Sequence, residues 1–132
     1  MKNNNMIILL LVLFLGFNTL EGAEMKNIQS VSIVELIANS EKYQDEKIRV
    51  VGFLKVGFEA QALYLSEADY ENAVTKNALW VSFDKRGEYK KFNQQYVLIE
   101  GIFDAKSKGH LKMYSATIRE VDRVILWGDK SQ

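Results

Sequence analysis

The sequence predicts an all-β domain with short helices, arranged as a five-stranded OB-fold Greek-key barrel that is preceded by a short N-terminal helix. Short runs rich in β-branched and aromatic residues recur along the chain and are separated by polar turns. Two of these runs, residues 47–54 and 96–103, each contain a glycine at an equivalent place, Gly52 and Gly101. A glycine inside a strand often marks a bulge or a tight bend, so two such strands favour a closed or half-closed barrel.

Length and composition limit the possible classes of protein. The 132 residues are enough for one domain and too few for two ordinary ones. The 17 basic and 17 acidic residues give a formal net charge of zero. Proteins that bind nucleic acid normally carry a basic excess that displaces counterions, so this balance disfavours a nucleic-acid partner. The chain has no cysteine, which excludes disulfides, thiolate zinc sites and cysteine nucleophiles.

Residues 1–23 have the pattern of a signal peptide. A lysine at position 2 precedes an almost wholly apolar stretch over residues 6–17. Its length fits a signal-peptide core of roughly 7–15 residues and falls short of the ~20 that a spanning helix needs. Cleavage is expected after Ala23 and leaves a single OB-fold domain over residues 24–132 without a stable membrane span. An uncleaved anchor is the alternative. We therefore expect a periplasmic or secreted protein.

The first element of the expected domain is a short helix that begins after Ser32 and ends near residues 39–42. Ser32 and Glu35 have the spacing of a capping box, in which each side chain bonds the backbone N–H of the other residue. Val31 and Leu36 occupy the two positions of a hydrophobic staple. A polar turn then leads into the first strand, residues 47–55.

The remaining elements follow from alternation and from turn residues. In the first strand, one face is expected to carry Ile48, Val50, Gly52 and Leu54. A second capping box at Ser66 predicts one helical turn as far as Ala73. A further turn of helix is expected over residues 88–92. The other strands are expected over residues 63–66, 78–83, 96–104 and 111–118, with a β-prone run over 121–127 and loops over 56–61 and 105–109.

The segment over residues 43–53, Tyr-Gln-Asp-Glu-Lys-Ile-Arg-Val-Val-Gly-Phe, resembles the opening of small bacterial OB-fold families of the tRNA_anti-like type. In those families a short helix leads through a tyrosine, a turn and a lysine into a strand with a V-x-G ending. The resemblance covers residues 32–120 in outline and is specific around residues 36–54. It implies the OB fold and an envelope location, in families whose molecular functions are mostly undefined. Asp45 departs from the pattern, because a turn glycine is common there.

Catalytic patterns are weak in this sequence. His110 is the single histidine, and no nucleophile-elbow glycines surround any serine that would complete a triad with it. A zinc site needs three or four N, S or O ligands, and one histidine with no cysteine leaves only carboxylates for the rest, which disfavours catalytic zinc. Asp45 with Glu46, and Asp69 with Glu71, lack the spacing of a shared acid–base or calcium site. We therefore expect no enzymatic activity, no cofactor and no metal. The four acidic residues are interpreted as solvent-exposed surface charges.

A binding face is easier to place. OB-folds bind oligonucleotides or oligosaccharides on strands two and three, between the first-to-second and fourth-to-fifth strand loops. On this face and its rims, aromatic rings would stack and basic side chains would neutralise charge. The predicted ligand-binding residues are Tyr64, Trp80, Lys106, Lys108 and His110, with Phe58 on the opposite rim. This placement requires five side chains to point inward, namely Leu63, Leu65, Leu79, Val81 and Phe83. The competing interpretation is that the two aromatic rings only pack, because aromatic residues favour strands.

These observations predict an exported, non-enzymatic binding module that acts in the periplasm or cell envelope on a small ligand, a glycan or a peptide. The alternative is a protein-interaction role, as an exported inhibitor, an immunity factor or an accessory subunit. The partner is thus an envelope ligand or an envelope protein, and its identity stays open. Exposure of Tyr64, Trp80 and His110 is the property that separates a binding face from a packed scaffold.

Overall fold

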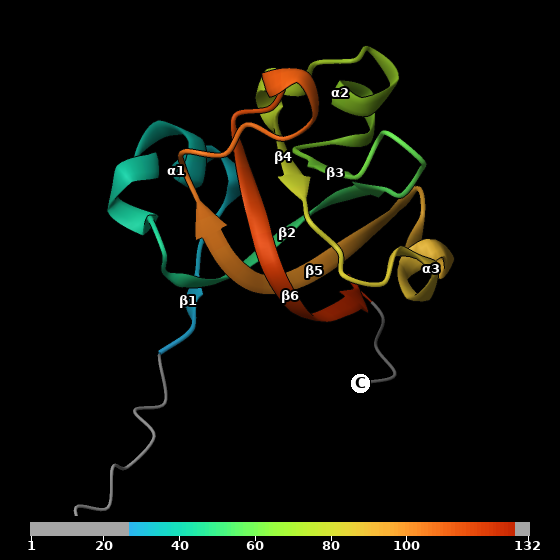
Figure 1. The fold of residues 1–132 in the computed structure, drawn as a ribbon. Helices are drawn as coiled ribbons and strands as arrows, with labels where there is room; N and C mark the ends of the chain where they lie inside the picture. Colours follow the sequence, from blue (N-terminus) through green and yellow to red (C-terminus); the bar gives the residue numbers. More distant parts are fainter. Residues whose placement is uncertain (1–26, 129–132) are drawn as a thin grey trace, which may run out of the picture.

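A computed structural model describes residues 27–128 and contains a closed β-barrel (Figure 1). The predicted signal peptide over residues 1–23 lies outside the described residues. The barrel order is β2-β3-β4-β6-β5, and β5 pairs back with β2. Strands β4 and β6 are parallel, and the other neighbours are antiparallel. This arrangement confirms the predicted fold class and is consistent with an OB-fold. The barrel strands are β2 (Lys47–Lys55), β3 (Ala62–Tyr64), β4 (Ala78–Val81), β5 (Gln95–Asp104) and β6 (Ala116–Leu126).

One short strand, three short α-helices and four 3₁₀ turns lie outside the barrel strands in the described residues. A two-residue strand, β1 (Gln29–Ser30), pairs in parallel with the first part of β2. The α-helices are α1 (Ile33–Ala38), α2 (Glu67–Glu71) and α3 (Arg86–Tyr89), and the 3₁₀ turns are Ser40–Tyr43, Thr75–Asn77, Lys90–Phe92 and His110–Lys112. The predicted helix after Ser32, the turn after Ser66 and the helical turn near residues 88–92 are therefore all present.

Helix α1 packs its apolar side against the barrel core. Ile33 and Leu36 are both fully buried there. The Ser32 hydroxyl accepts a hydrogen bond from the Glu35 backbone N–H at 3.1 Å, as the capping box predicts. The predicted reciprocal hydrogen bond from the Ser32 backbone N–H to the Glu35 side chain is wrong. The Glu35 carboxylate instead accepts from the Tyr43 hydroxyl at 2.9 Å and from the Asn39 amide at 3.0 Å. The carboxylate thus ties the helix to the 3₁₀ turn that follows it.

Replacing Tyr43 with phenylalanine is expected to make stability less dependent on acid pH. The Tyr43 hydroxyl, followed by the Asn39 amide, holds the pKa of Glu35 below its usual value. A carboxyl pKa that is lower in the folded state stabilises that state at pH values above the unfolded pKa of about 4.3. This contribution is lost as the pH falls through the folded pKa. Urea unfolding should therefore separate Tyr43→Phe from the parent at pH 7, and the difference should narrow as the pH falls below the unfolded pKa of Glu35. Tyr89→Phe is the control, and a difference that does not narrow as the pH falls would contradict the assignment.

The barrel interior is built by the alternation of side chains along the strands. Ile48, Val50 and Leu54 of β2 point into it, as predicted, and Phe103 of β5 is fully buried among them. The ladder between β2 and β5 runs through Gly52 without a change of register. The ladder between β5 and β6 does change register next to Gly101, so only that glycine lies at the predicted irregularity.

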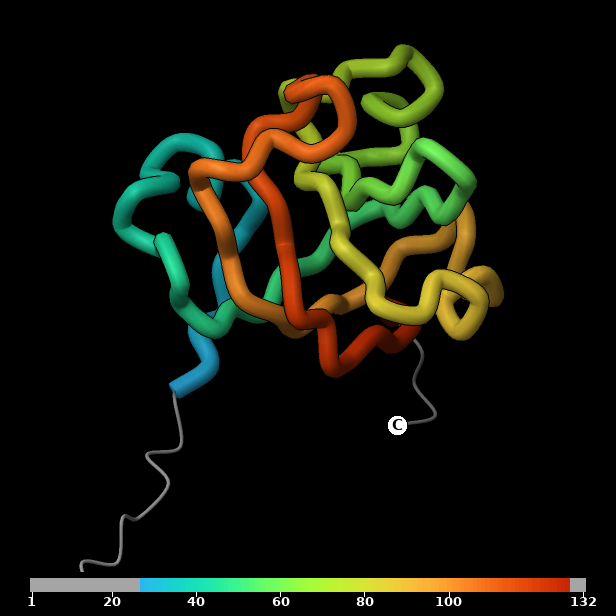
Figure 2. The backbone as a smooth tube through the Cα atoms, in the orientation of Figure 1, coloured from blue at the N-terminus to red at the C-terminus, as the bar shows by residue number. Residues whose placement is uncertain are grey.

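The last strand differs from the prediction. Residues 110–115 form a loop rather than the start of a strand, because Leu111 and Lys112 have φ angles of 51° and 57°. Two successive left-handed residues turn the chain out of the extended conformation that a ladder needs. Strand β6 then runs from Ala116 to Leu126, with Glu120 at φ 50° where its pairing with β5 shifts register, so the β-prone run over 121–127 belongs to the same strand. The loop between β5 and β6 consequently extends over residues 105–115 and is longer than expected (Figure 2).

Candidate functional site

The outer face of β3 and β4 carries a second hydrophobic cluster, separate from the barrel interior. Leu63, Leu79 and Val81 point inward and are fully buried in the main core, as predicted. Tyr64 and Trp80 point to the opposite face, also as predicted. Contrary to prediction, Leu65 lies beyond the end of β3 and is 39% exposed. The second cluster comprises Phe53, Ala62, Tyr64, Ala78 and Tyr114, with Tyr70 and Trp80 packed against it.

Tyr64 is a buried member of this cluster and is not accessible to solvent. Its side chain is only 5% exposed, because α2 folds back and places the Tyr70 ring 5.5 Å from the Tyr64 ring. Burial, with a smaller effect of neighbouring Tyr114, raises the pKa of Tyr64 well above its ordinary value. The hydroxyl is therefore neutral at physiological pH and has no acid–base role there. Tyr64 supports the face rather than contacting a ligand.

Trp80 is half-buried at the edge of the same cluster. The His110 ring lies 6.3 Å from the Trp80 ring at an interplanar angle of 25°, and the Tyr114 ring lies 5.4 Å away. The Gly109 backbone is so close that a Cβ built there would lie 2.5 Å from Trp80 Cγ. The structure thus brings together two of the predicted residues, Trp80 and His110. Three residues of one loop, Gly109, His110 and Tyr114, thus lie against the indole, which is only partly exposed.

The segment that flanks Trp80 turns apolar side chains outward. Leu111 is 76% exposed and Met113 is 43% exposed. The base of the loop is held firmly, since the Lys108 ammonium donates to the Ser115 carbonyl and the Ser115 hydroxyl donates to the Lys76 carbonyl. We call Trp80, His110, Leu111 and Met113 the Trp80 surface. A well-anchored loop that exposes large apolar side chains is a common feature of binding surfaces.

The predicted lysines line a separate hollow. Lys106 is exposed, and with Lys108 it lines a hollow of about 430 Å³ next to the 3₁₀ turn Ser40–Tyr43. Gln44 forms part of this hollow, and its side-chain carbonyl accepts from the Ala105 N–H at 2.8 Å. Neither Trp80 nor His110 lines it. Lys106 and Lys108 thus line this hollow, and Lys108 also anchors the base of the loop that carries the Trp80 surface.

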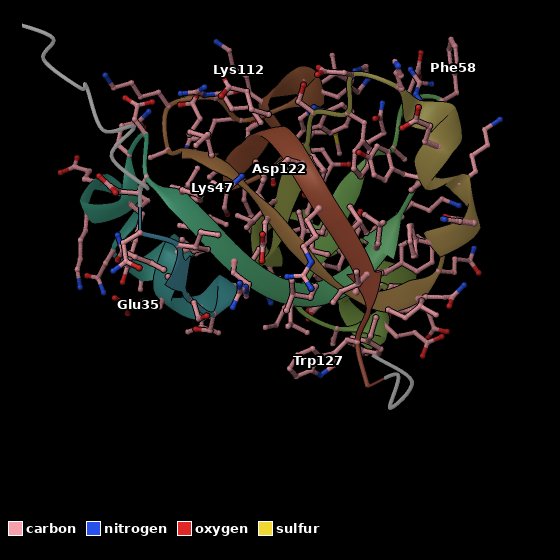
Figure 3. All side chains as sticks on the ribbon, turned by 90° about the horizontal axis from the view of Figure 1, so that it is seen from below. Glu35, Lys47, Phe58, Lys112, Asp122 and Trp127 are labelled. Carbon is pink, nitrogen blue, oxygen red and sulfur yellow. The ribbon has the colours of Figure 1, made fainter. Side chains whose placement is uncertain are left out.

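Phe58 lies in the other predicted rim, the loop over residues 56–61, and is 83% exposed (Figure 3). The Arg86 guanidinium lies 5.7 Å from the centre of its ring and donates to the Phe58 carbonyl at 3.0 Å. Cation–π contact and this hydrogen bond together orient an aromatic ring that faces solvent. The sequence placed Phe58 on a rim but gave no signal for Arg86, which is 28 residues away along the chain.

Comparison with known proteins leaves the family resemblance as a prediction. A scan against protein-family models matches no family, and a search of curated proteins finds no match. Across residues 27–128, no helix has the length and apolar character needed to span a membrane. Within the same residues, histidine, aspartate and glutamate side chains form no group of three suited to hold a metal ion.

Proposed function

We propose that this protein is an exported, non-enzymatic binding module of the periplasm or cell envelope that recognises its ligand through the Trp80 surface. The observation that carries the proposal is the exposure of Leu111 beside Trp80, on a loop whose base is fixed by hydrogen bonds. An exposed leucine with a left-handed backbone costs free energy in the unbound protein. Burial of that side chain against a ligand would offset the cost.

Among a small ligand, a glycan and a peptide, this surface favours a peptide with apolar side chains. A sugar ring stacks on an open aromatic face, whereas the half-buried Trp80 indole already has Gly109, His110 and Tyr114 against it. Leu111 offers no hydrogen bond to hydroxyl groups, but its side chain can pack against an aliphatic or aromatic side chain. The ligand proposed for the Trp80 surface is therefore an apolar peptide segment.

A folded protein partner is the second candidate, as expected for an inhibitor, an immunity factor or an accessory subunit. The oriented and exposed ring of Phe58 favours this candidate. Aromatic anchors of this kind carry much of the energy of protein interfaces. A folded partner would be large enough to contact both loops, whereas a short peptide would occupy the Trp80 surface alone.

A photo-crosslinking residue placed at Leu111 is expected to capture a discrete product in the periplasmic fraction of intact cells. The same residue at Val34, which is 58% exposed on α1, is the control and should yield no product. Capture from Leu111 alone supports a peptide, and the same product from Leu111 and Phe58 supports a folded partner. No product from Leu111, equal products from Leu111 and Val34, or a cytoplasmic location would contradict the proposal.

A further inference from the structure

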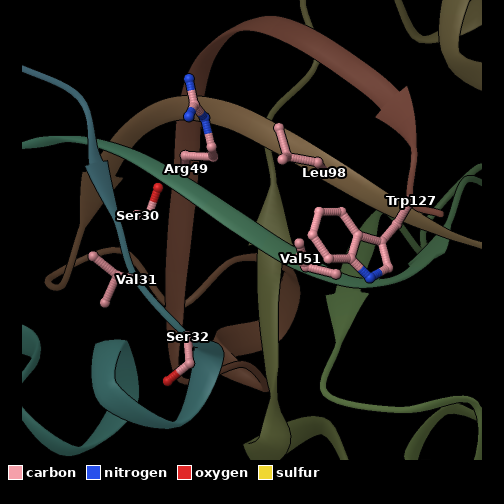
Figure 4. A pocket seen from close by; sticks show the side chains of 7 residues that line it. All are labelled: Ser30, Val31, Ser32, Arg49, Val51, Leu98 and Trp127. Atoms are coloured by element: carbon pink, nitrogen blue, oxygen red, sulfur yellow. The ribbon is translucent and has the colours of Figure 1, made fainter. Parts of the chain in front are cut away.

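A second surface of the barrel, distant in the fold from the Trp80 loop, contains an apolar groove. It runs over the outer side of β2 and β5 and has a volume of about 520 Å³, within the range of small-molecule sites (Figure 4). Trp127, which follows the end of β6, stands at its wall and is 57% exposed. The lining residues are Ser30, Val31, Ser32, Arg49, Val51, Leu98 and Trp127.

The groove is charged at one end and apolar at the other. Cross-strand pairing places Arg49 opposite Glu100 and, two residues along β2, Val51 opposite Leu98. Trp127 lies beyond this apolar pair, so that Val51 and Leu98 lie between it and Arg49 in Figure 4. Successive outward residues of a strand are roughly 7 Å apart, so the polarity changes within one or two strand rows. The arrangement suits a ligand with a polar head and an apolar tail.

The polar end carries a net positive charge. Glu100 is buried, and its Oε1 accepts from Arg49 Nε at 2.7 Å and from Arg123 Nη1 at 3.1 Å. Two guanidinium groups and one carboxylate leave one positive charge, while the nearby Lys47 and Asp122 neutralise each other (Figure 3). Among the described residues, the two Nη atoms of Arg49 have no hydrogen-bond partner. They are available to an anionic group, which a guanidinium can bind with two parallel hydrogen bonds.

Apart from Ser30 and Ser32 at its wall, the floor of the groove offers no hydrogen-bond partner to a peptide backbone. It is the continuous ladder between β2 and β5, whose backbone groups are already bonded to each other. A bound peptide would leave its own N–H and C=O groups without partners over Val51 and Leu98, which is costly. An alkyl chain has no such groups and gains free energy from every methylene that it buries.

We propose that this groove binds a single-chain aliphatic carboxylate, with the carboxylate on Arg49 and the alkyl chain along Val51 and Leu98 toward Trp127. Three features of the groove support this assignment: the guanidinium of Arg49, the apolar floor and the exposed indole. The site is independent of the Trp80 surface, so either can be present without the other. It adds a ligand class, a free fatty acid, to a protein whose proposed partner is a peptide or protein.

Decanoate titration in a Trp80→Phe background tests this proposal, because Trp127 is then the single tryptophan of the chain. We expect a saturable blue shift of the Trp127 emission as the alkyl chain covers the indole. The neutral alcohol 1-decanol should bind at least about tenfold more weakly, and acetate should give no shift, because head and tail are both required.

Two arginine variants provide the matched comparison. Arg49→Gln is expected to weaken decanoate binding about tenfold or more, whereas Arg123→Gln should change it less than about twofold. Both remove one positive charge and one contact to Glu100, but only Arg49 lines the groove. If Arg49→Gln does not fold, Val51→Ala provides the test, because it leaves the ion pairs intact. It should weaken the binding of decanoate and of 1-decanol alike.

Several results would overturn the assignment. Equal affinity for decanoate and 1-decanol would remove the carboxylate from the site. Equal weakening by Arg49→Gln and Arg123→Gln would reduce the effect to net charge. Binding of a leucine-ended peptide with a free carboxylate, without binding of decanoate, would assign the groove to peptide termini instead.

Discussion

Alanine in place of Gly52 is expected to lower the free energy of unfolding by about 3 kcal/mol, because the added methyl group has no room. A Cβ at this position would lie 2.6 Å from the Tyr64 carbonyl oxygen and 2.7 Å from Leu63 Cγ, both on β3. It would also lie 2.8 Å from Ile33 Cδ1 of α1. A backbone carbonyl held in the β2–β3 ladder cannot move away without breaking that ladder.

Two other glycines make this expectation specific. A Cβ at Gly87 meets nothing within 4 Å, so Gly87→Ala should change stability by less than about 1 kcal/mol. At Gly101 a Cβ would lie 2.7 Å from a methyl group of the fully buried Ile118 and 2.9 Å from the Arg119 carbonyl oxygen, so Gly101→Ala should also cost more than Gly87→Ala. Urea denaturation of the three variants measures the order. A loss below about 1 kcal/mol for Gly52→Ala would contradict the close packing of α1, β2 and β3.

The sequence predicted the barrel because its signals are local. Alternating apolar residues define β2 and β5, and the prediction of strand 96–104 differs from the observed β5 by one residue. The structural reason for Gly52 differs from the expected bend in the strand. Gly52 lies in an uninterrupted ladder and is required by the close approach of β3 and α1, which is a tertiary contact. Only Gly101 lies beside a change of register.

The candidate site was less predictable because it depends on what covers each strand. Alternation placed Tyr64 and Trp80 on the correct face, but it carries no information about α2 folding over one of them. The exposed Leu111 was missed because the sequence around it alternates like a strand. Leucine and lysine rarely adopt the left-handed backbone found at positions 111 and 112, so composition gave no warning of it. The groove at Trp127 also joins residues from both ends of the described chain, which local patterns cannot bring together.

Gly109→Ala is expected to disrupt the Trp80 surface and to lower the free energy of unfolding by about 3 kcal/mol. Gly109 has φ 65° and ψ −156°, a conformation essentially restricted to glycine. The added Cβ would also lie 2.5 Å from Trp80 Cβ and Cγ, which are fixed to β4 rather than at the free end of a flexible side chain. Backbone strain and steric overlap therefore act together, and the loop over residues 105–115 must move away from the indole.

Gly128→Ala separates these two effects, because Gly128 also has a positive φ, 86°, but a Cβ there meets nothing within 4 Å. It should cost about 1 kcal/mol or less. In a Trp127→Phe background, Gly109→Ala should shift the Trp80 emission to the red as the ring becomes more exposed, and Gly128→Ala should not. Combining Gly109→Ala with Trp80→Ala should recover about 1 kcal/mol relative to the sum of the single changes, since alanine lacks the Cγ and Cδ2 atoms that the new Cβ would overlap. Additive losses would mean that Gly109 acts through backbone conformation alone, and that the contact between loop and indole does not hold the Trp80 surface in place.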